Sequence, residues 1–103
     1  MHATIRRYEG VDSARTNEVV GKVNETLVPQ LRKLPGFAGY YLIEAGGGVL
    51  SSLGLFDTAE QANDSGMLVS KWIADEEFTT AIPGVPKITS GKVVAQSNGV
   101  AAS

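Results

Sequence analysis

The chain has 103 residues, which is enough for one domain with its own hydrophobic core and too few for two. Nine basic and eleven acidic residues leave a net charge of -2, which gives no basic surface for nucleic acid or an anionic membrane. The absence of cysteine excludes disulfides and thiolate chemistry, and no apolar run approaches the roughly 20 residues of a membrane span. We therefore expect a cytoplasmic protein without nucleic-acid or membrane partners.

The N-terminal third predicts a strand followed by a kinked helix. Residues Ala3–Glu9 favour a short strand. From Ala14 to Leu34, apolar residues recur at steps of three and four, which is typical of a helix with one buried face. Pro29 lies inside this pattern and lacks a backbone N–H, so the helix should kink or split near Glu25–Thr26.

A β-hairpin is predicted at the centre of the chain. Two runs rich in aromatic and β-branched residues flank the triplet Gly46–Gly48. Glycine takes positive φ angles without steric cost, as a tight hairpin turn requires. We therefore predict that Phe37–Ala45 pairs with Val49–Asp57.

Both faces of this hairpin are apolar, so each of them needs a covering layer. By alternation, Phe37, Tyr41 and Ile43 share one face, while Tyr40 and Leu42 share the other. Helices of the same chain can cover one face only. A large bare apolar face is unusual on a monomer, so we expect a homodimer whose two sheets pack face to face.

The C-terminal half predicts a second helix and a last strand. Thr58 and Gln61 have capping-box spacing and mark the start of a helix over about Ala59–Ala74. Asp75–Ala81 resembles one more helical turn, and Lys87–Gln96 alternates loosely as a strand does.

The resulting element order is β-α-β-β-α-β, which is typical of a ferredoxin-like α+β fold. Such a fold has a four-stranded antiparallel sheet with both helices on one face. We expect a single domain over residues 1–96 and a disordered tail over residues 97–103.

Several segments resemble the dimeric α+β barrel superfamily, in its antibiotic-biosynthesis-monooxygenase-like (ABM) branch. They are Leu34–Phe37, the tyrosine-rich strand after it, Phe56–Glu60 and Trp72–Phe78. The resemblance extends over about Ala3–Gln96. It implies the fold just described, dimerised into an α+β barrel, and a small apolar or aromatic ligand held between the helices and the sheet.

Haem-degrading members of the superfamily use an asparagine on the first strand, a tryptophan on the second helix and a histidine after it. Trp72 matches the tryptophan, and Phe78 matches the aromatic residue that follows. The histidine position is occupied by Ile82, and the asparagine position falls near Arg6 or Arg7. Because this set is incomplete, we expect neither haem nor another cofactor.

Cofactor-independent monooxygenases of the superfamily hold phenolic or quinol-like substrates with tryptophan, tyrosine and asparagine side chains. Asn24 or Asn63 could supply the asparagine. Our candidate ligand-binding residues are Trp72, Phe78, Tyr8 and Tyr41. Two hypotheses remain open: an uncharacterised binding protein and a monooxygenase of this type.

Each candidate residue also has a purely structural interpretation. Trp72 could close the core beside Phe78, and a buried tyrosine usually bonds to a structural partner. Arg6 and Arg7 could bind a carboxylate or phosphate, or could instead pair with surface acids or reach across a dimer interface. His2 is the only histidine, and we predict no metal site and assign no catalytic residue.

Overall fold

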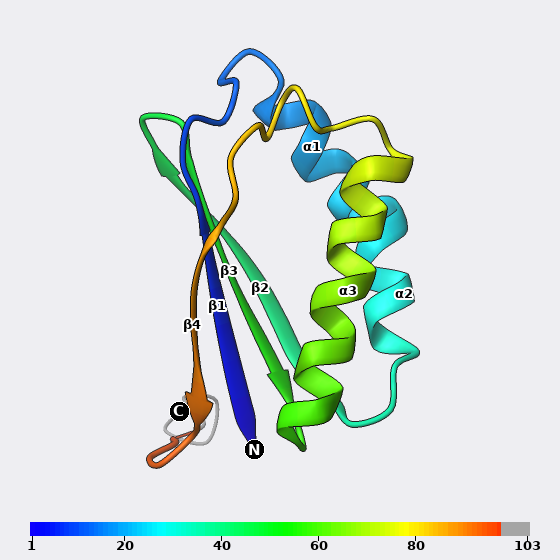
Figure 1. The fold of residues 1–103 in the computed structure, drawn as a ribbon, viewed down its shortest axis with the longest axis vertical. Coiled ribbons are helices and arrows are strands. Elements are labelled where there is room, and N and C mark those ends of the chain that lie inside the picture. Colours follow the sequence, from blue (N-terminus) through cyan, green and yellow to red (C-terminus); the bar gives the residue numbers. More distant parts are fainter. Residues whose placement is uncertain (98–103) are drawn as a thin grey trace, which may run out of the picture.

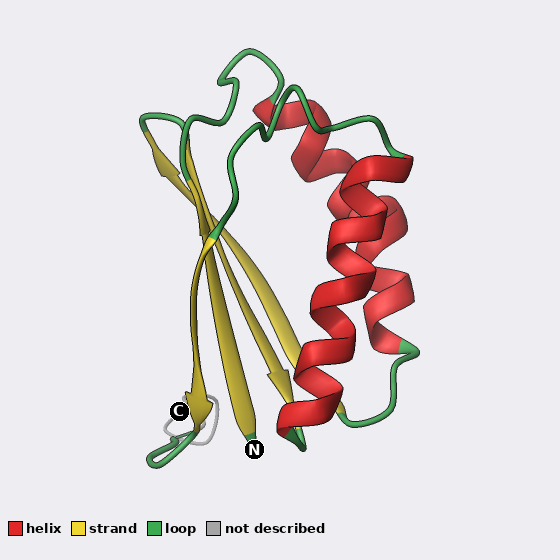
Figure 2. Ribbon diagram, in the orientation of Figure 1, coloured by secondary structure: helices red, strands yellow, loops and turns green. Residues whose placement is uncertain are grey.

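The computed structural model describes residues 1–97 as a four-stranded antiparallel sheet with its helices on one face (Figures 1 and 2). The strands are β1 (His2–Tyr8), β2 (Phe37–Gly46), β3 (Val49–Phe56) and β4 (Lys87–Lys92), in the order β2-β3-β1-β4. The predicted ferredoxin-like fold is confirmed. Within the described residues, no helix combines the length and the apolar character needed to cross a membrane.

The first helical region consists of three consecutive segments, α1 (Thr16–Lys22), the π-helical segment η1 (Val23–Leu27) and α2 (Val28–Arg32). Pro29 cannot donate to the carbonyl of Glu25, and its ring crowds that carbonyl. The widened π turn lies around this missing bond, so the predicted interruption is confirmed.

The longest helix is α3 (Ala59–Asp75), and it begins at the predicted capping box. Thr58 Oγ1 accepts from the backbone N–H of Gln61 at 3.2 Å, and Gln61 Oε1 accepts from the N–H of Thr58 at 3.1 Å. These two bonds satisfy backbone donors that a helix start leaves free.

The predicted hairpin turn at the glycine triplet is confirmed by its backbone angles. Gly46, Gly47 and Gly48 have φ angles of 81°, 61° and 78°. Side chains with a Cβ rarely adopt this backbone conformation, so the three glycines permit β2 and β3 to be joined directly.

One prediction about the hairpin faces is wrong. The register of β2 against β3 shifts just after Phe37, so the strand contains a β-bulge there. The shift brings Phe37 to the helix-covered side, where its ring centroid lies 5.8 Å from that of Phe56. Tyr41 and Ile43 remain together on the open face, 60% and 54% exposed.

The segment after α3 contains the further turn that was predicted over Asp75–Ala81. Asp75 still belongs to α3, and Ile82 N–H donates to the Phe78 carbonyl at 2.8 Å, which closes one turn of helix. Between them, Glu77 takes a φ of 60° and reverses the chain. This reversal places Phe78 in the core, as expected, with 2% of its surface exposed.

The last strand is shorter than the predicted Lys87–Gln96, because the strand that it pairs with, β1, begins at His2. β4 pairs with β1, and His2 at the start of β1 is the partner of Lys92. Beyond this pair, one backbone bond remains, from Val93 N–H to the Met1 carbonyl at 2.9 Å. Residues 98–103 of the predicted tail lie outside the described residues.

Candidate ligand-binding site

Three of the four predicted ligand-binding residues meet between the helices and the sheet. Trp72, Phe78 and Tyr8 are 5%, 2% and 8% exposed and belong to one core cluster. The rings of Trp72 and Phe78 have centroids 5.5 Å apart. The structure does not bring Tyr41 to them, since it lies on the opposite, open face of the sheet.

The space beside these core residues is small. A void of about 20 Å³ lies among Tyr8, Tyr40 and Trp72. This is room for about one water molecule, and far less than an aromatic ring requires. Trp72 Nε1 donates to Thr26 Oγ1 at 2.8 Å, so its polar atom has a partner within the protein. The contacts of Trp72 are therefore those of a core residue.

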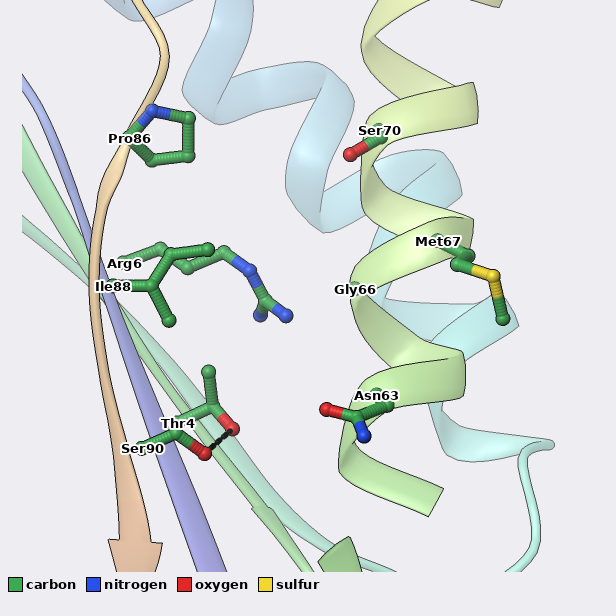
Figure 3. Close-up of a pocket in the computed structure, with 9 residues that line it drawn as sticks. All are labelled: Thr4, Arg6, Asn63, Gly66, Met67, Ser70, Pro86, Ile88 and Ser90. Carbon is green, nitrogen blue, oxygen red and sulfur yellow. Dashed lines mark hydrogen bonds between the residues drawn. The ribbon is translucent and has the colours of Figure 1, made fainter. Parts of the chain in front are cut away.

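A much larger space lies on the other side of α3. A cleft of about 460 Å³ separates α3 from the β1–β4 edge of the sheet (Figure 3). Its walls come from three elements and the residue before β4: Thr4 and Arg6 of β1, Ile88 and Ser90 of β4, Asn63, Gly66, Met67 and Ser70 of α3, and Pro86.

Strand alternation and register explain the sheet wall of this cleft. Thr4, Arg6 and Tyr8 face the helices because alternate residues of a strand point to the same side. The register pairs Thr4 with Ser90 and Arg6 with Ile88, which brings β4 into the same wall. The helix-facing side of β1 thus becomes polar towards its N-terminal end.

Arg6 is the central residue of the cleft. It is 9% exposed, and its side chain extends from β1 towards Gly66 of α3 (Figure 3). A Cβ at residue 66 would overlap the guanidinium, so glycine provides the space that Arg6 occupies. From the sequence, Gly66 is only a small residue within a predicted helix, whereas the structure shows which side chain the missing Cβ accommodates.

 Arg6 and Gly66 are therefore a matched pair across the cleft.

No acidic group neutralises Arg6 within residues 1–97. It has neither a salt bridge nor a hydrogen bond there, and no carboxylate lines the cleft. Arg7, by contrast, pairs with Glu9 at 2.9 Å on the exposed side, as one of the sequence alternatives anticipated. The two adjacent arginines thus have opposite environments, one satisfied at the surface and one left free in a cleft.

The positive charge of Arg6 also acts on one buried and one partly buried phenol. Burial raises the pKa of Tyr8, and the charge of Arg6 opposes that rise. Desolvation raises the pKa of Tyr40 to about 12, the neighbouring Tyr8 adds to the rise, and Ser52 and the charge of Arg6 oppose it. Both phenols therefore stay neutral at physiological pH, and neither supplies a counter-ion for the guanidinium.

Small polar groups complete the cleft. Ser90 Oγ lies 2.8 Å from His2 Nε2 and 3.3 Å from Thr4 Oγ1. Asn63 and Ser70 point from α3 towards the strands (Figure 3). These groups can donate hydrogen bonds to a ligand and orient it. Among the described residues, no cluster of three or more His, Asp or Glu side chains could hold a metal ion.

Sequence reasoning left Arg6 with several alternatives and did not place it in the ligand site. The available signals were strand alternation, which puts Arg6 on the same side as Tyr8, and a glycine inside a predicted helix. Neither signal reveals that residues 6 and 66 face each other, because that contact joins two elements distant in the sequence.

No family model matches this sequence, and no curated protein matches it either. Solved structures do match. The protein NE2512 of unknown function from Nitrosomonas europaea has 12% identity and a TM-score of 0.74, with 94% of this chain and 92% of that chain covered.

Two further solved structures share the fold. The monooxygenase from the gene ActVA-Orf6 of Streptomyces coelicolor, in complex with Nanaomycin D, has 14% identity and a TM-score of 0.69, covering 94% and 90% of the two chains. A dimeric ferredoxin-like protein from an uncultured marine organism has 13% identity and a TM-score of 0.63, covering 94% and 96%. At these identities the likeness concerns the fold alone, and the ferredoxin-like α+β fold implied by the sequence resemblance is confirmed.

Proposed function

We propose that this protein binds a small organic molecule in the cleft between α3 and the β1–β4 edge. The observation that carries the proposal is the cleft itself: its volume of about 460 Å³ lies in the range of small-molecule sites. Its walls combine apolar surface, from Met67, Pro86 and Ile88, with a few polar groups that can orient a ligand. The packed space beside Trp72 offers no comparable room.

A cleft-filling variant tests this proposal. Ser70 is exposed on the cleft side of α3, so Ser70→Phe adds a ring to the cleft without displacing a core residue. Ala74→Phe is the matched control, because residue 74 is exposed on the same helix and does not line the cleft. Calorimetric titration with aromatic acids and quinols should show binding that Ser70→Phe weakens and Ala74→Phe preserves. Equal binding by both variants would contradict the proposal.

We also propose a homodimer formed through the open sheet face. Tyr41, Leu53 and Ile5 lie side by side across β2, β3 and β1 on that face, with Tyr41 60% and Ile5 43% exposed. A solved structure of the same fold is described as a dimeric ferredoxin-like protein. Analytical ultracentrifugation at micromolar concentration should give the mass of two chains, and a single-chain mass would contradict the dimer.

An alternative function is cofactor-independent monooxygenation of a phenolic or quinol-like substrate. The supporting observation is that a structure of the same fold is a monooxygenase bound to Nanaomycin D. His2 is hydrogen-bonded to Ser90, which lines the cleft. Its imidazole could therefore exchange a proton with a bound ligand by way of the Ser90 hydroxyl. Oxygen consumption with a panel of quinols should then exceed the protein-free rate and fall in His2→Gln. Rates that never exceed this background would exclude the alternative.

A further inference from the structure

We infer that the ligand of this cleft is a small organic acid and that Arg6 binds its carboxylate. The inference rests on the proposed small-molecule function and adds the chemical class of the ligand. It is carried by the pair formed across the cleft by Arg6 of β1 and Gly66 of α3.

The charge of Arg6 has no partner within residues 1–97, since its guanidinium makes neither a salt bridge nor a hydrogen bond there. The residue as a whole is only 9% exposed, yet no buried side-chain nitrogen of the described residues lacks a partner, so the N–H groups of Arg6 open into the cleft. A charge in such a partly desolvated place gains from an oppositely charged partner. Its planar fork of N–H donors matches a carboxylate with two parallel hydrogen bonds. An anion from outside the chain would therefore satisfy what the fold leaves free.

Gly66 leaves room for the Arg6 side chain at the surface of α3. Because a Cβ at residue 66 would overlap the guanidinium, the glycine allows Arg6 to reach α3. Asn63 and Ser70 lie three residues before and four residues after Gly66, so all three share one face of the helix. The side chains of Asn63 and Ser70 therefore lie on either side of the guanidinium, with the amide oxygen of Asn63 towards the strands (Figure 3). The Ser70 hydroxyl can donate to a remaining lone pair of a carboxylate, and so can the amide nitrogen of Asn63 once its side chain rotates.

The other residues that line the cleft are neutral, and several of them are apolar. No acidic side chain lines the cleft among the described residues, so nothing repels an anion or competes with it for Arg6. Pro86 and Ile88 provide apolar surface next to the guanidinium (Figure 3). A molecule with a carboxylate and an apolar or aromatic body fits this arrangement better than inorganic phosphate or a cation.

Two probes that differ only in charge test the inference. Naphthoate carries a carboxylate, and naphthamide replaces it with a neutral amide of similar shape. We expect the protein to bind naphthoate at least about tenfold more tightly, because charge-assisted hydrogen bonds are the stronger ones. Arg6→Gln should abolish this preference, and Arg6→Lys should retain part of it. Arg7→Gln is the matched control and should leave the preference unchanged, since Arg7 lies on the exposed side.

Nuclear magnetic resonance titration of the full chain reads out both the affinity and the place of binding. The amide signals of Thr4, Gly66 and Ser90 should shift with naphthoate. Equal affinity for the two probes would overturn the carboxylate inference and leave the proposed small-molecule function standing. No shift of the cleft amides with either probe would contradict both.

Discussion

Trp72 donates a hydrogen bond of 2.8 Å from its indole N–H to the hydroxyl of Thr26, and this bond joins α3 to the π-helical segment η1. Thr26 Oγ1 in turn donates to the carbonyl of Lys22 at 3.0 Å. The only tryptophan of the chain is thus fixed to the helical segment that Pro29 distorts. This contact gives Trp72 a structural role that does not depend on a ligand.

Removing the hydroxyl at this contact should destabilise the protein. Thr26→Val has nearly the same shape and leaves the buried indole N–H without a partner, so we expect a loss of about 1–3 kcal/mol in the free energy of unfolding. Thr26→Ser keeps the hydroxyl and should lose clearly less. Urea unfolding followed by circular dichroism measures both, and equal stability of Thr26→Val and the unmodified protein would show that the bond contributes nothing.

Replacing Arg6 should affect stability in the opposite direction. Arg6→Met keeps much of the side-chain volume and removes a partly desolvated charge that has no partner within residues 1–97. We expect the free energy of unfolding of the ligand-free protein to rise by on the order of 1 kcal/mol. Thermal unfolding of this variant beside Arg7→Met provides the comparison. A marked loss of stability in Arg6→Met alone would indicate that Arg6 serves the fold.

The partly buried phenol of Tyr40 predicts a loss of stability at alkaline pH. Its pKa is raised from 10.0 to about 12 in the folded protein, so between these values the folded state holds a proton that the unfolded state has released. The contribution is fully present below pH 10 and is lost as the pH rises towards 12, by up to about 1.4 kcal/mol per pH unit.

A phenylalanine variant isolates this effect. Tyr40→Phe should make the free energy of unfolding fall less steeply with pH over this window than in the unmodified protein, as denaturant titrations at several pH values would show. Identical slopes in the two proteins would mean that the burial of Tyr40 does not govern this loss.

The open face predicts how the proposed dimer can be dissociated. Tyr41→Lys places a charge among the apolar side chains that would pack against the partner, while the position itself is 60% exposed in a single chain. We expect a folded monomer by light scattering after size-exclusion chromatography. Val85→Lys is the control, because residue 85 is 93% exposed and lies outside the sheet. A dimer that survives Tyr41→Lys would place the interface elsewhere.

Local signals were sufficient to predict most of the fold. The glycine triplet defined the hairpin, the Thr58–Gln61 capping box marked the start of α3, and Pro29 located the break in the first helix. The features that escaped prediction depend on neighbouring elements. The bulge after Phe37 follows from packing against Phe56, and β4 ends where its partner β1 begins.

The candidate site was harder to predict for the same reason. Aromatic residues such as Trp72 and Phe78 drew attention because of their chemistry, yet they pack into the core. Arg6 and Gly66 are unremarkable in their own segments, and only the approach of α3 to β1 brings them together. That Arg6 has no partner within residues 1–97 can be recognised only once the residues around it are known.

The most direct test of this account is a crystal structure of the protein soaked with naphthoate. We predict the ligand in the cleft between α3 and the β1–β4 edge, with its carboxylate against the Arg6 guanidinium and its rings near Ile88. A ligand that instead displaces Trp72 from the core, or that lies on the open sheet face beside Tyr41, would contradict the assignment of the site.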